Sequence, residues 1–294
     1  MPRLTIGVPV YNSETLLEQC LGNLAAQTFP DFKVIVLDNA STDGTRDIAQ
    51  RFAARDPRFE YHRQPRNVGA KQNFADVLTR ADTDYFMWRA DDDVSDVNFV
   101  EILVKLLDAN SDAALAVSRS ELDKSRKRRT KRFPLRGTFE PRSVYRIRLL
   151  LRARASWMYG IFRTSELRWS LKRVYDNYVH VNGFDFLVLF PFLWTMRVVG
   201  SNEPAFVTGF VDRPGAATAS GLMDPRPMLE IRRDFLKYCW SILPELSRSE
   251  ALTTLMTPIV WLYADRSYRL MKIVNARLRV MLGQAPTGVA KNYD

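Results

Sequence analysis

Three consecutive aspartates are the residues of this sequence best suited to bind a metal ion. Asp91, Asp92 and Asp93 follow the apolar run 85–88, which is typical of a buried strand. Carboxylate oxygens are hard ligands that suit Mg²⁺ or Mn²⁺, and such ions usually reach a protein through one or two carboxylates plus substrate phosphates. A run of acids can also form a solvated loop, so the triplet alone leaves both interpretations open.

Two other strand patterns end in polar residues. The run 33–37 ends in Asp38 and the turn-forming stretch 39–44, and the run 4–10 leads into Tyr11 and Asn12. In open α/β sheets, ligands bind outside the carboxyl ends of the strands. All three polar clusters should therefore converge on one crevice, which favours a metal-nucleotide site over a solvated loop.

Alternating strand and helix patterns over residues 1–118 predict βαβ units and a mainly parallel sheet. The helix pattern 70–80 places Ala70, Asn73, Phe74, Val77 and Leu78 on one face. After the aspartates we expect a helix carrying Val100, Leu103, Val104 and Leu107, and then a strand over 113–118.

The pattern is less regular beyond residue 154. We predict a buried strand over 157–163, an apolar helix over 184–196 interrupted at Pro191, and a strand over 203–212. Residues 227–282 are predicted to be helical, with breaks near Pro244 and Pro258.

Composition narrows the classes of protein and site. The chain has 294 residues, 46% of them hydrophobic, which is enough for a substantial core. Its two cysteines and two histidines exclude a disulfide framework and a histidine-rich metal site, and they favour a reducing, cytoplasmic setting. We see no leader pattern before Leu4, and the uncharged stretch 251–264 is shorter than the roughly 20 residues of a spanning helix.

The net charge of +10 is concentrated in one segment. Residues 119–154 carry 14 Lys/Arg against 3 Asp/Glu, and 124–132 form the most basic block. This block could contact nucleic acid, but the acidic residues 1–118 and the lack of a nucleic-acid motif argue against that partner. An anionic membrane surface on the cytoplasmic side and a solvated loop remain alternatives.

Four motifs in order resemble those of family 2 glycosyltransferases: Pro9-Val10-Tyr11-Asn12, residues 38–45, Asn67-Val68-Gly69, and Ala90-Asp91-Asp92-Asp93. The resemblance covers the first 120 residues well and the middle third loosely. It implies an α/β GT-A fold, a Rossmann-like mainly parallel sheet flanked by helices, with a helical C-terminal extension over 221–294. The GT-A domain would span 1–220, with a nucleotide-binding half (1–118), the basic segment (119–154) and an acceptor-binding half (155–220).

The resemblance assigns roles to the first two motifs and to the loop before the helix at residue 70. It implies that the nucleotide pocket is lined by Pro9, Tyr11 and Asn12, and that Asp38 contacts the base or ribose. Asn67, Gly69 and Lys71 would form a loop that closes over the base. Each of these residues also has an ordinary structural interpretation as a strand end, a turn or a solvated helix position.

For the aspartate triplet, the resemblance implies a D-x-D pair, Asp91 and Asp93, with Asp92 as a further direct ligand of Mn²⁺ or Mg²⁺. The ion would bridge the donor phosphates and stabilise the departing nucleoside diphosphate. The chain departs from the pattern at Arg89, where many relatives have an acid. Arg89 could lower the metal affinity or contact a phosphate, and the sequence does not decide between these.

Inverting transfer needs a base for the acceptor hydroxyl. Asp185 fits the family position, with Asp176 as the alternative base and helix capping as the alternative role of Asp185. The resemblance places Trp157, Tyr159 and Arg163 on the acceptor side and Arg213 at the diphosphate.

The resemblance thus predicts transfer of a single sugar from a nucleotide sugar, UDP-linked, to a glycan or lipid-linked acceptor in cell-surface polysaccharide or glycolipid synthesis. The segment Ser165-Glu166-Leu167-Arg168-Trp169 lacks the Gln of the processive Q-x-x-R-W motif, so single addition is favoured. A polyanion-binding protein and a degenerate transferase that binds nucleotide without turnover are the alternatives.

Overall fold

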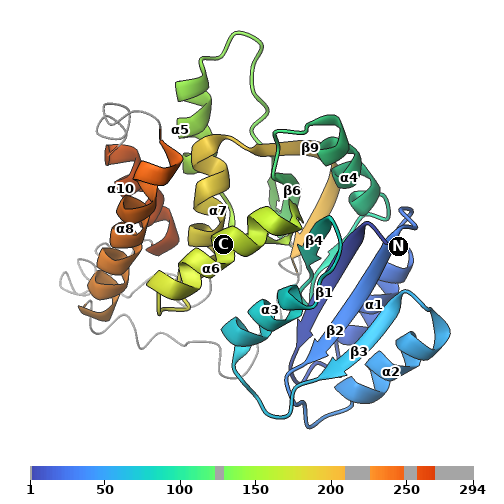
Figure 1. Ribbon diagram of the computed structural model, residues 1–294. Coiled ribbons are helices and arrows are strands. Elements are labelled where there is room, and N and C mark those ends of the chain that lie inside the picture. Colours follow the sequence, from blue (N-terminus) through green and yellow to red (C-terminus); the bar gives the residue numbers. More distant parts are fainter. Residues whose placement is uncertain (1, 123–128, 209–225, 248–256, 269–294) are drawn as a thin grey trace, which may run out of the picture. The chain divides into compact units, whose positions relative to one another are not determined.

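The computed structural model describes residues 2–122, 129–208, 226–247 and 257–268, and the chain divides into two compact units (Figure 1). The first unit consists of Met1–Gly137, Ser156–Leu171 and Arg197–Val211. The second consists of Thr138–Ala155, Lys172–Met196 and Asp212–Asp294. The predicted domain boundary near residue 220 stays a prediction.

The first unit is built on a sheet whose N-terminal half is parallel. Its strands are β1 (Leu4–Val10), β2 (Phe32–Asp38), β3 (Phe59–Arg63) and β4 (Tyr85–Trp88), in the order β3-β2-β1-β4. All seven residues of β1 are buried, as expected for a parallel strand covered on both faces. The strands predicted at 4–10, 33–37 and 85–88 are therefore confirmed.

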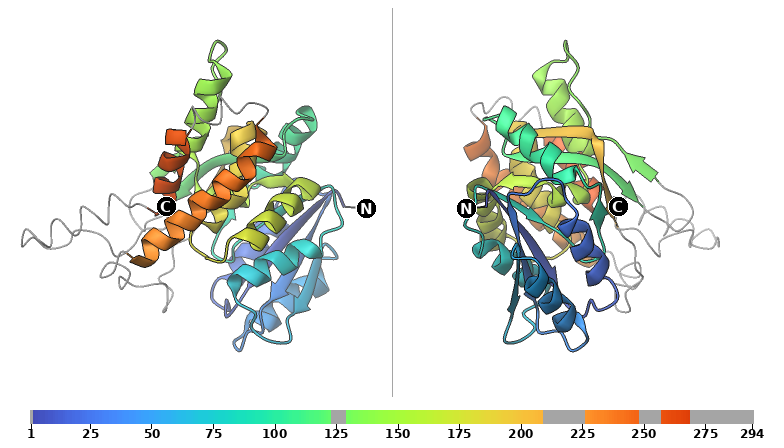
Figure 2. Two further views of the ribbon diagram at one scale, coloured as in Figure 1. Left: turned by 60° about the vertical axis from the view of Figure 1, so that its left-hand side comes forward. Right: turned by 90° about the vertical axis from the view of Figure 1, so that its right-hand side faces the viewer.

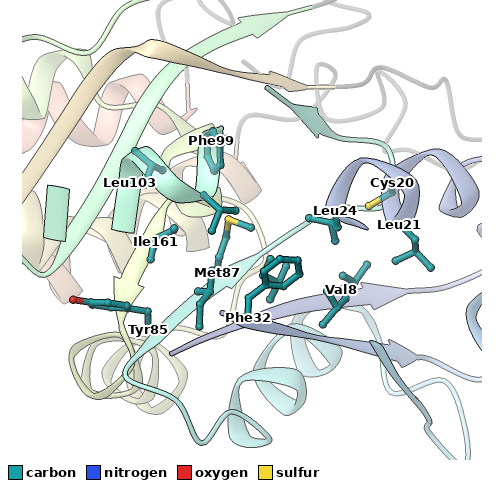
Figure 3. Close-up of a cluster of buried hydrophobic side chains, with 14 of the residues drawn as sticks. Val8, Cys20, Leu21, Leu24, Phe32, Tyr85, Met87, Phe99, Leu103 and Ile161 are labelled. Atoms are coloured by element: carbon teal, nitrogen blue, oxygen red, sulfur yellow. The ribbon is translucent and has the colours of Figure 1, made fainter. Parts of the chain in front are cut away.

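Helices cover both faces of these strands (Figure 2). They are α1 (Leu17–Ala25), α2 (Thr45–Arg55), α3 (Ala70–Thr79) and α4 (Phe99–Ala109). Val8 and Met87 share a buried cluster with residues of α1 and α4, among them Leu21 and Leu103 (Figure 3). On the opposite face, a Cβ on Gly7 would come within 3.0 Å of Val77 in α3. The glycine therefore permits the close approach of α3 to β1.

The rest of the sheet is mixed, in the order β4-β8-β6-β9-β5 with β7 paired to β6. Its elements are β5 (Val94–Ser95), β6 (Leu115–Leu122), β7 (Arg129–Lys131) and, after the 3₁₀ turn η1 (Ala155–Tyr159), β8 (Ile161–Arg163) and β9 (Val198–Thr208). Strand β6 pairs with β9 in parallel and with β7 and β8 in antiparallel orientation. The expected mostly parallel α/β sheet flanked by helices is confirmed.

The strand predicted over 157–163 is wrong in its first half. Ala155–Tyr159 forms η1, and only Ile161–Arg163 is extended. The amide of Gly160 donates to the carbonyl of Trp157 at 3.1 Å. A Cβ added at Gly160 would overlap the β6 backbone at Ala116. A tight turn ending in glycine thus brings the chain against β6, and the apolar run alone does not reveal it.

The described part of the second unit is helical. It contains α5 (Arg142–Arg152), α7 (Phe184–Thr195), α8 (Arg226–Leu246) and α10 (Thr257–Tyr268), and α6 (Thr164–Asn177) runs from the first unit into it. The Tyr263 hydroxyl of α10 donates to the carbonyl of Phe186 in α7 at 2.6 Å. Within the described ranges, no helix is both long and apolar enough to cross a bilayer.

Prolines 191, 244 and 258 bear on the predicted helix breaks. The predicted interruption at Pro191 is wrong, because α7 continues through it. Residues 186–194 are all buried, so packing on every side outweighs the lost backbone hydrogen bond. Pro244 lies inside the last turn of α8, and Pro258 is the second residue of α10, where a missing N–H costs little.

Candidate active site

The carboxyl ends of β1 and β2 are joined by hydrogen bonds between the loops that follow them. Asn12, in a left-handed conformation with φ of 50°, accepts the Thr42 amide on its side-chain oxygen at 2.9 Å. Its own amide donates to the Ser41 hydroxyl at 2.9 Å, and the Ser13 amide donates to the Thr45 hydroxyl at 2.7 Å. The structure therefore brings the predicted Asn12 beside the loop of Asp38. Tyr11 is 41% exposed at this edge.

Pro9 lies within β1, where it pairs with Leu37 of β2. The carbonyl of Gly7, two residues earlier, accepts from the amide of Arg89, so the nitrogen of Pro9 faces the β4 side. The pairing of β1 with β4 ends at Gly7 and Trp88. The sheet therefore does not need a backbone N–H at position 9, and Pro9 is tolerated there.

Asp38, the last residue of β2, is fully buried and held by three donors. One carboxylate oxygen accepts the Ser41 amide at 2.8 Å. The other accepts from the Tyr61 hydroxyl at 2.8 Å and from the Arg63 guanidinium at 2.7 Å. Arg63 lies opposite Asp38 in the register of β2 and β3. Asp38 therefore fixes the loop after β2, and Tyr61 and Arg63 are site residues that the sequence reasoning missed.

The loop before α3 is tied to the end of β2 by two asparagines. The side-chain amide of Asn39 donates to the Asn67 side-chain oxygen at 2.8 Å, and its oxygen accepts the Val68 amide at 2.9 Å. Gly69 has a φ of 83°, a conformation that favours glycine. Lys71 follows in the first turn of α3, and partial burial lowers its pKa. The structure thus places the predicted Asn67, Gly69 and Lys71 beside the loop of Asp38.

The aspartates lie at the end of β4, in the turn between β4 and β5. Asp91 and Asp93 are 5% and 3% exposed, and Asp92 is half-buried. The Ser13 hydroxyl, from the loop after β1, donates to Asp91. Ser13 is another residue that the sequence reasoning missed, although it directly follows the motif at 9–12.

Buried carboxylates at a strand end fit a divalent ion. Among the described residues, no group of three or more His, Cys, Asp or Glu side chains is placed to hold a metal. Mg²⁺ and Mn²⁺ do not need such a group, because one or two carboxylates and the phosphates of a substrate complete their coordination. Asp91 and Asp93 are the two most buried carboxylates of the triplet and could supply those ligands, with Asp92 beside them.

Arg89 points into the core beneath this turn. Its side chain is 0% exposed, its Nη2 donates to the Ser95 hydroxyl at 2.8 Å, and its guanidinium carbon lies 5.6 Å and 5.0 Å from the ring centres of Phe99 and Phe206. A fully buried guanidinium in this position does not reach a phosphate in solvent. Its burial argues against the phosphate contact, and an effect of Arg89 on metal affinity stays a prediction.

Asp185 belongs to the second unit and lies in the first turn of α7, after Gly183 in the left-handed conformation. Burial raises the pKa of Asp185 to about 6, although hydrogen bonds from the backbone amides of Phe186 and of Asp185 itself lower it. A carboxylate with such a pKa is a stronger base than an exposed one and is still ionised at neutral pH. The alternative base, Asp176, is exposed and paired with Lys172 at 2.6 Å.

The aromatic and basic residues predicted for the acceptor side have structural contacts. Trp157 is buried, with its ring 5.5 Å from that of Phe133. Tyr159 is half-buried and stacks on Phe206 at 5.4 Å, and the Arg163 guanidinium donates to the carbonyl of Ala113 at 2.8 Å. Arg213 and residues 123–128 of the basic block lie outside the described residues.

Known proteins resemble this chain in sequence and in fold. A glucosyltransferase of Campylobacter jejuni, named for a GalNAc(5)-diNAcBac-PP-undecaprenol substrate, is 32% identical over 94 residues, 32% of this chain and 30% of the relative. The segments matched in the first curated relatives span less than a third of their lengths.

Two solved structures share the fold. TarS 1–349 of S. aureus in complex with UDP has a TM-score of 0.66 at 18% identity, covering 96% of this chain and 76% of TarS. The mannosyltransferase PcManGT of Pyrobaculum calidifontis, in complex with GDP-Man and Mn²⁺, has a TM-score of 0.53 at 18% identity, covering 95% and 81%. The model of glycosyl transferase family 2 matches residues 5–178, more than half of the chain. The chain is therefore a member of glycosyl transferase family 2.

Proposed function

We propose that this glycosyltransferase transfers a single sugar from a UDP-linked donor, with inversion, to a glycan or lipid-linked acceptor in polysaccharide or glycolipid synthesis. The observation that carries the proposal is the meeting of three polar strand ends at one sheet edge, where Asn12, Asp38 and Asp91 are connected through short hydrogen-bonded loops. UDP is the nucleotide in the TarS complex, and a lipid-linked acceptor appears in the name of the Campylobacter relative.

In this proposal the nucleotide binds at the ends of β1 and β2. Tyr11 is exposed enough to contact a base, and the loop of Asn67, Gly69 and Lys71 closes over it. The three donors to Asp38 hold its loop in one conformation. Asp38 would then contribute to binding of the base or ribose partly by holding the surrounding groups in place. This lowers the loss of conformational entropy when the nucleotide binds.

A divalent ion held by Asp91 and Asp93, with Asp92 beside them, would supply charge stabilisation for the departing nucleoside diphosphate. Ser13 orients Asp91 by donating a hydrogen bond to it. Mn²⁺ is present in the PcManGT complex, and carboxylate ligands suit both Mn²⁺ and Mg²⁺.

Asp185 is the proposed base. It would accept the proton of the acceptor hydroxyl as that oxygen attacks the anomeric carbon and the bond to the diphosphate breaks. Its pKa of about 6 leaves it ionised at neutral pH.

Two parts of the proposal rest wholly or partly on residues outside the described ranges. Arg213 would pair with the diphosphate, since a guanidinium matches phosphate geometry. The basic block 124–132 would hold the enzyme at an anionic membrane surface, where the acceptor lipid would lie.

A panel of nucleotide sugars tests the proposal. Calorimetry with UDP-, GDP- and dTDP-linked sugars, with and without Mn²⁺, should show UDP-linked binding that strengthens with the ion. Asp91→Asn should weaken this binding, and Asp47→Asn, at an exposed acid of α2, should not. Equal or absent binding of all nucleotides would contradict the assignment.

A further inference from the structure

Arg89 carries a positive charge inside the core of the first unit. It follows β4, and its backbone amide donates to the carbonyl of Gly7 in β1 at 2.9 Å. Because every second side chain of a strand points to the same face, the side chain of Arg89 points, like those of Tyr85 and Met87, toward α1 and α4. Its side chain is fully buried. An arginine at this depth is expensive to desolvate and needs compensation.

Hydrogen bonds provide only part of that compensation. Within the part of the chain that the structure describes, Nη2 donates to Ser95, whereas the buried Nε and Nη1 have no hydrogen-bond partner. The faces of Phe99 and Phe206 lie within 5.6 Å and stabilise the cation through their ring quadrupoles. Neutral groups therefore hold the guanidinium in place, but none of them neutralises its charge.

The aspartate turn begins two residues after Arg89 and carries the acids closest to it in the chain. The pKa of Arg89 is lowered by burial and raised by attraction to Asp93. Cys20 faces the same space from α1, and its thiol donates to the carbonyl of Ala90. Burial raises the pKa of Cys20 to about 12, so this thiol stays neutral at physiological pH. Asp93 is then the acid whose negative charge attracts Arg89.

We propose that Arg89 is a built-in counter-cation that partly neutralises the Asp91–Asp93 turn and weakens divalent-ion binding by the free protein, so that the ion binds together with the nucleotide diphosphate. The inference rests on the metal role in the proposed function. A fixed positive charge repels a divalent ion at a neighbouring site. The phosphates of the nucleotide supply the negative charge that Arg89 has offset, and ion and nucleotide should therefore bind with positive coupling.

A purely structural role for Arg89 makes a different prediction. In that case Arg89 would act by fixing β5 through Ser95, which also bonds Asn23 of α1 through its amide at 2.9 Å. Ser95→Ala removes the hydroxyl that Arg89 bonds and keeps the charge. Arg89→Met removes the charge and keeps an apolar chain among the aromatic rings, and Arg89→Gln is a second neutral variant that keeps a donor.

The test is a Mn²⁺ titration followed by electron paramagnetic resonance, with and without UDP. Without UDP, Arg89→Met and Arg89→Gln should bind Mn²⁺ about tenfold or more tightly than wild type, and Ser95→Ala should stay near wild type. The gain in Mn²⁺ affinity on adding UDP should be smaller in both neutral variants. Circular dichroism identifies any variant that fails to fold, and Arg89→Lys, which keeps the charge, should bind Mn²⁺ like wild type.

The outcomes separate this inference from the proposed function. If wild type binds Mn²⁺ with UDP but the folded neutral variants show unchanged or weaker affinity, the counter-cation role is wrong and the metal role stands. The same conclusion follows if Ser95→Ala binds Mn²⁺ as tightly as the neutral variants of Arg89 are expected to. If wild type binds no Mn²⁺ even with UDP, the metal role itself is wrong, and the inference is lost with it.

Discussion

The carboxylates at the ends of β2 and β4 are both buried, but the protein neutralises them differently. Asp38 at the end of β2 accepts three hydrogen bonds, including one from the cation of Arg63. Asp91 accepts from Ser13, and Arg89, two residues before it in the chain, donates instead to Ser95. The first carboxylate is completed within the fold. In the proposed function, the second group instead holds a divalent ion together with the phosphates of the nucleotide.

The difference separates a carboxylate that holds its own loop from carboxylates that we propose bind an ion. A satisfied buried acid stabilises its loop, and its removal should affect folding and binding together. The acids of the β4 turn should act mainly on transition-state stabilisation. Substitutions at each strand end can therefore confirm or contradict the comparison.

Asp91→Ala and Asp93→Ala should have the largest effect. Each removes a proposed metal ligand, and transfer should fall by about three orders of magnitude or more, because the ion contributes several kcal/mol to stabilising the leaving group. The melting temperature of Asp91→Ala should stay near that of wild type, whereas Asp93→Ala should lower it, because Asp93 attracts the buried Arg89. Initial rates of UDP release and thermal melts provide the measurements, and a variant that unfolds while its specific activity persists would reverse the comparison.

Asp185→Asn extends the comparison to a half-buried carboxylate of the second unit. The amide preserves the shape but cannot accept the proton, and we expect kcat to fall by about 10² to 10⁴ with donor and metal binding kept. In the wild type, kcat/KM should rise as the pH increases through about 6 and then level off, because the deprotonated form is active. A near wild-type rate in Asp185→Asn would transfer the base role to Asp176.

Asp38→Ala should have a smaller effect on turnover and a measurable effect on stability. The variant leaves the Tyr61 hydroxyl and the Ser41 amide without their acceptor, which costs about 1 to 3 kcal/mol of unfolding free energy. The exposed Arg63 can turn to water and adds little. Nucleotide affinity should weaken, mainly as a higher KM. Unchanged UDP affinity by calorimetry would remove Asp38 from the pocket.

Neutralising the basic block should have the smallest effect on chemistry. Replacing Arg126, Lys127, Arg128 and Arg129 with glutamine should reduce binding to anionic liposomes and leave transfer to a soluble acceptor intact. The difference should shrink with added salt, because surface attraction is screened over about 8 to 10 Å. Liposome sedimentation measures it, and equal binding by both proteins would leave the block a solvated loop.

The sequence predicted the parts of the fold that repeat simple periodicities. Buried strands give continuous apolar runs, and their polar ends at Asn12, Asp38 and Asp91 are adjacent because parallel strands end at one edge. Helix α3 was predicted within a residue of its observed end because its apolar face has a clear 3.6-residue period.

The partners of these residues could not be predicted in the same way. Arg63 meets Asp38 only through the register of β2 and β3, and no local pattern specifies that register. The burial of Arg89 depends on Phe99 and Phe206, which come from distant parts of the chain. For Pro191, burial of α7 overrides a local signal that normally ends a helix.

Removal and return of the metal test the central claim most directly. Wild-type protein stripped with EDTA and supplied with its UDP-sugar and acceptor should release no UDP, and Mn²⁺ or Mg²⁺ should restore turnover. The Asp91→Ala and Asp93→Ala variants should not recover with either ion. Full turnover by the metal-free wild type would contradict the assignment of the β4 carboxylates as the metal site.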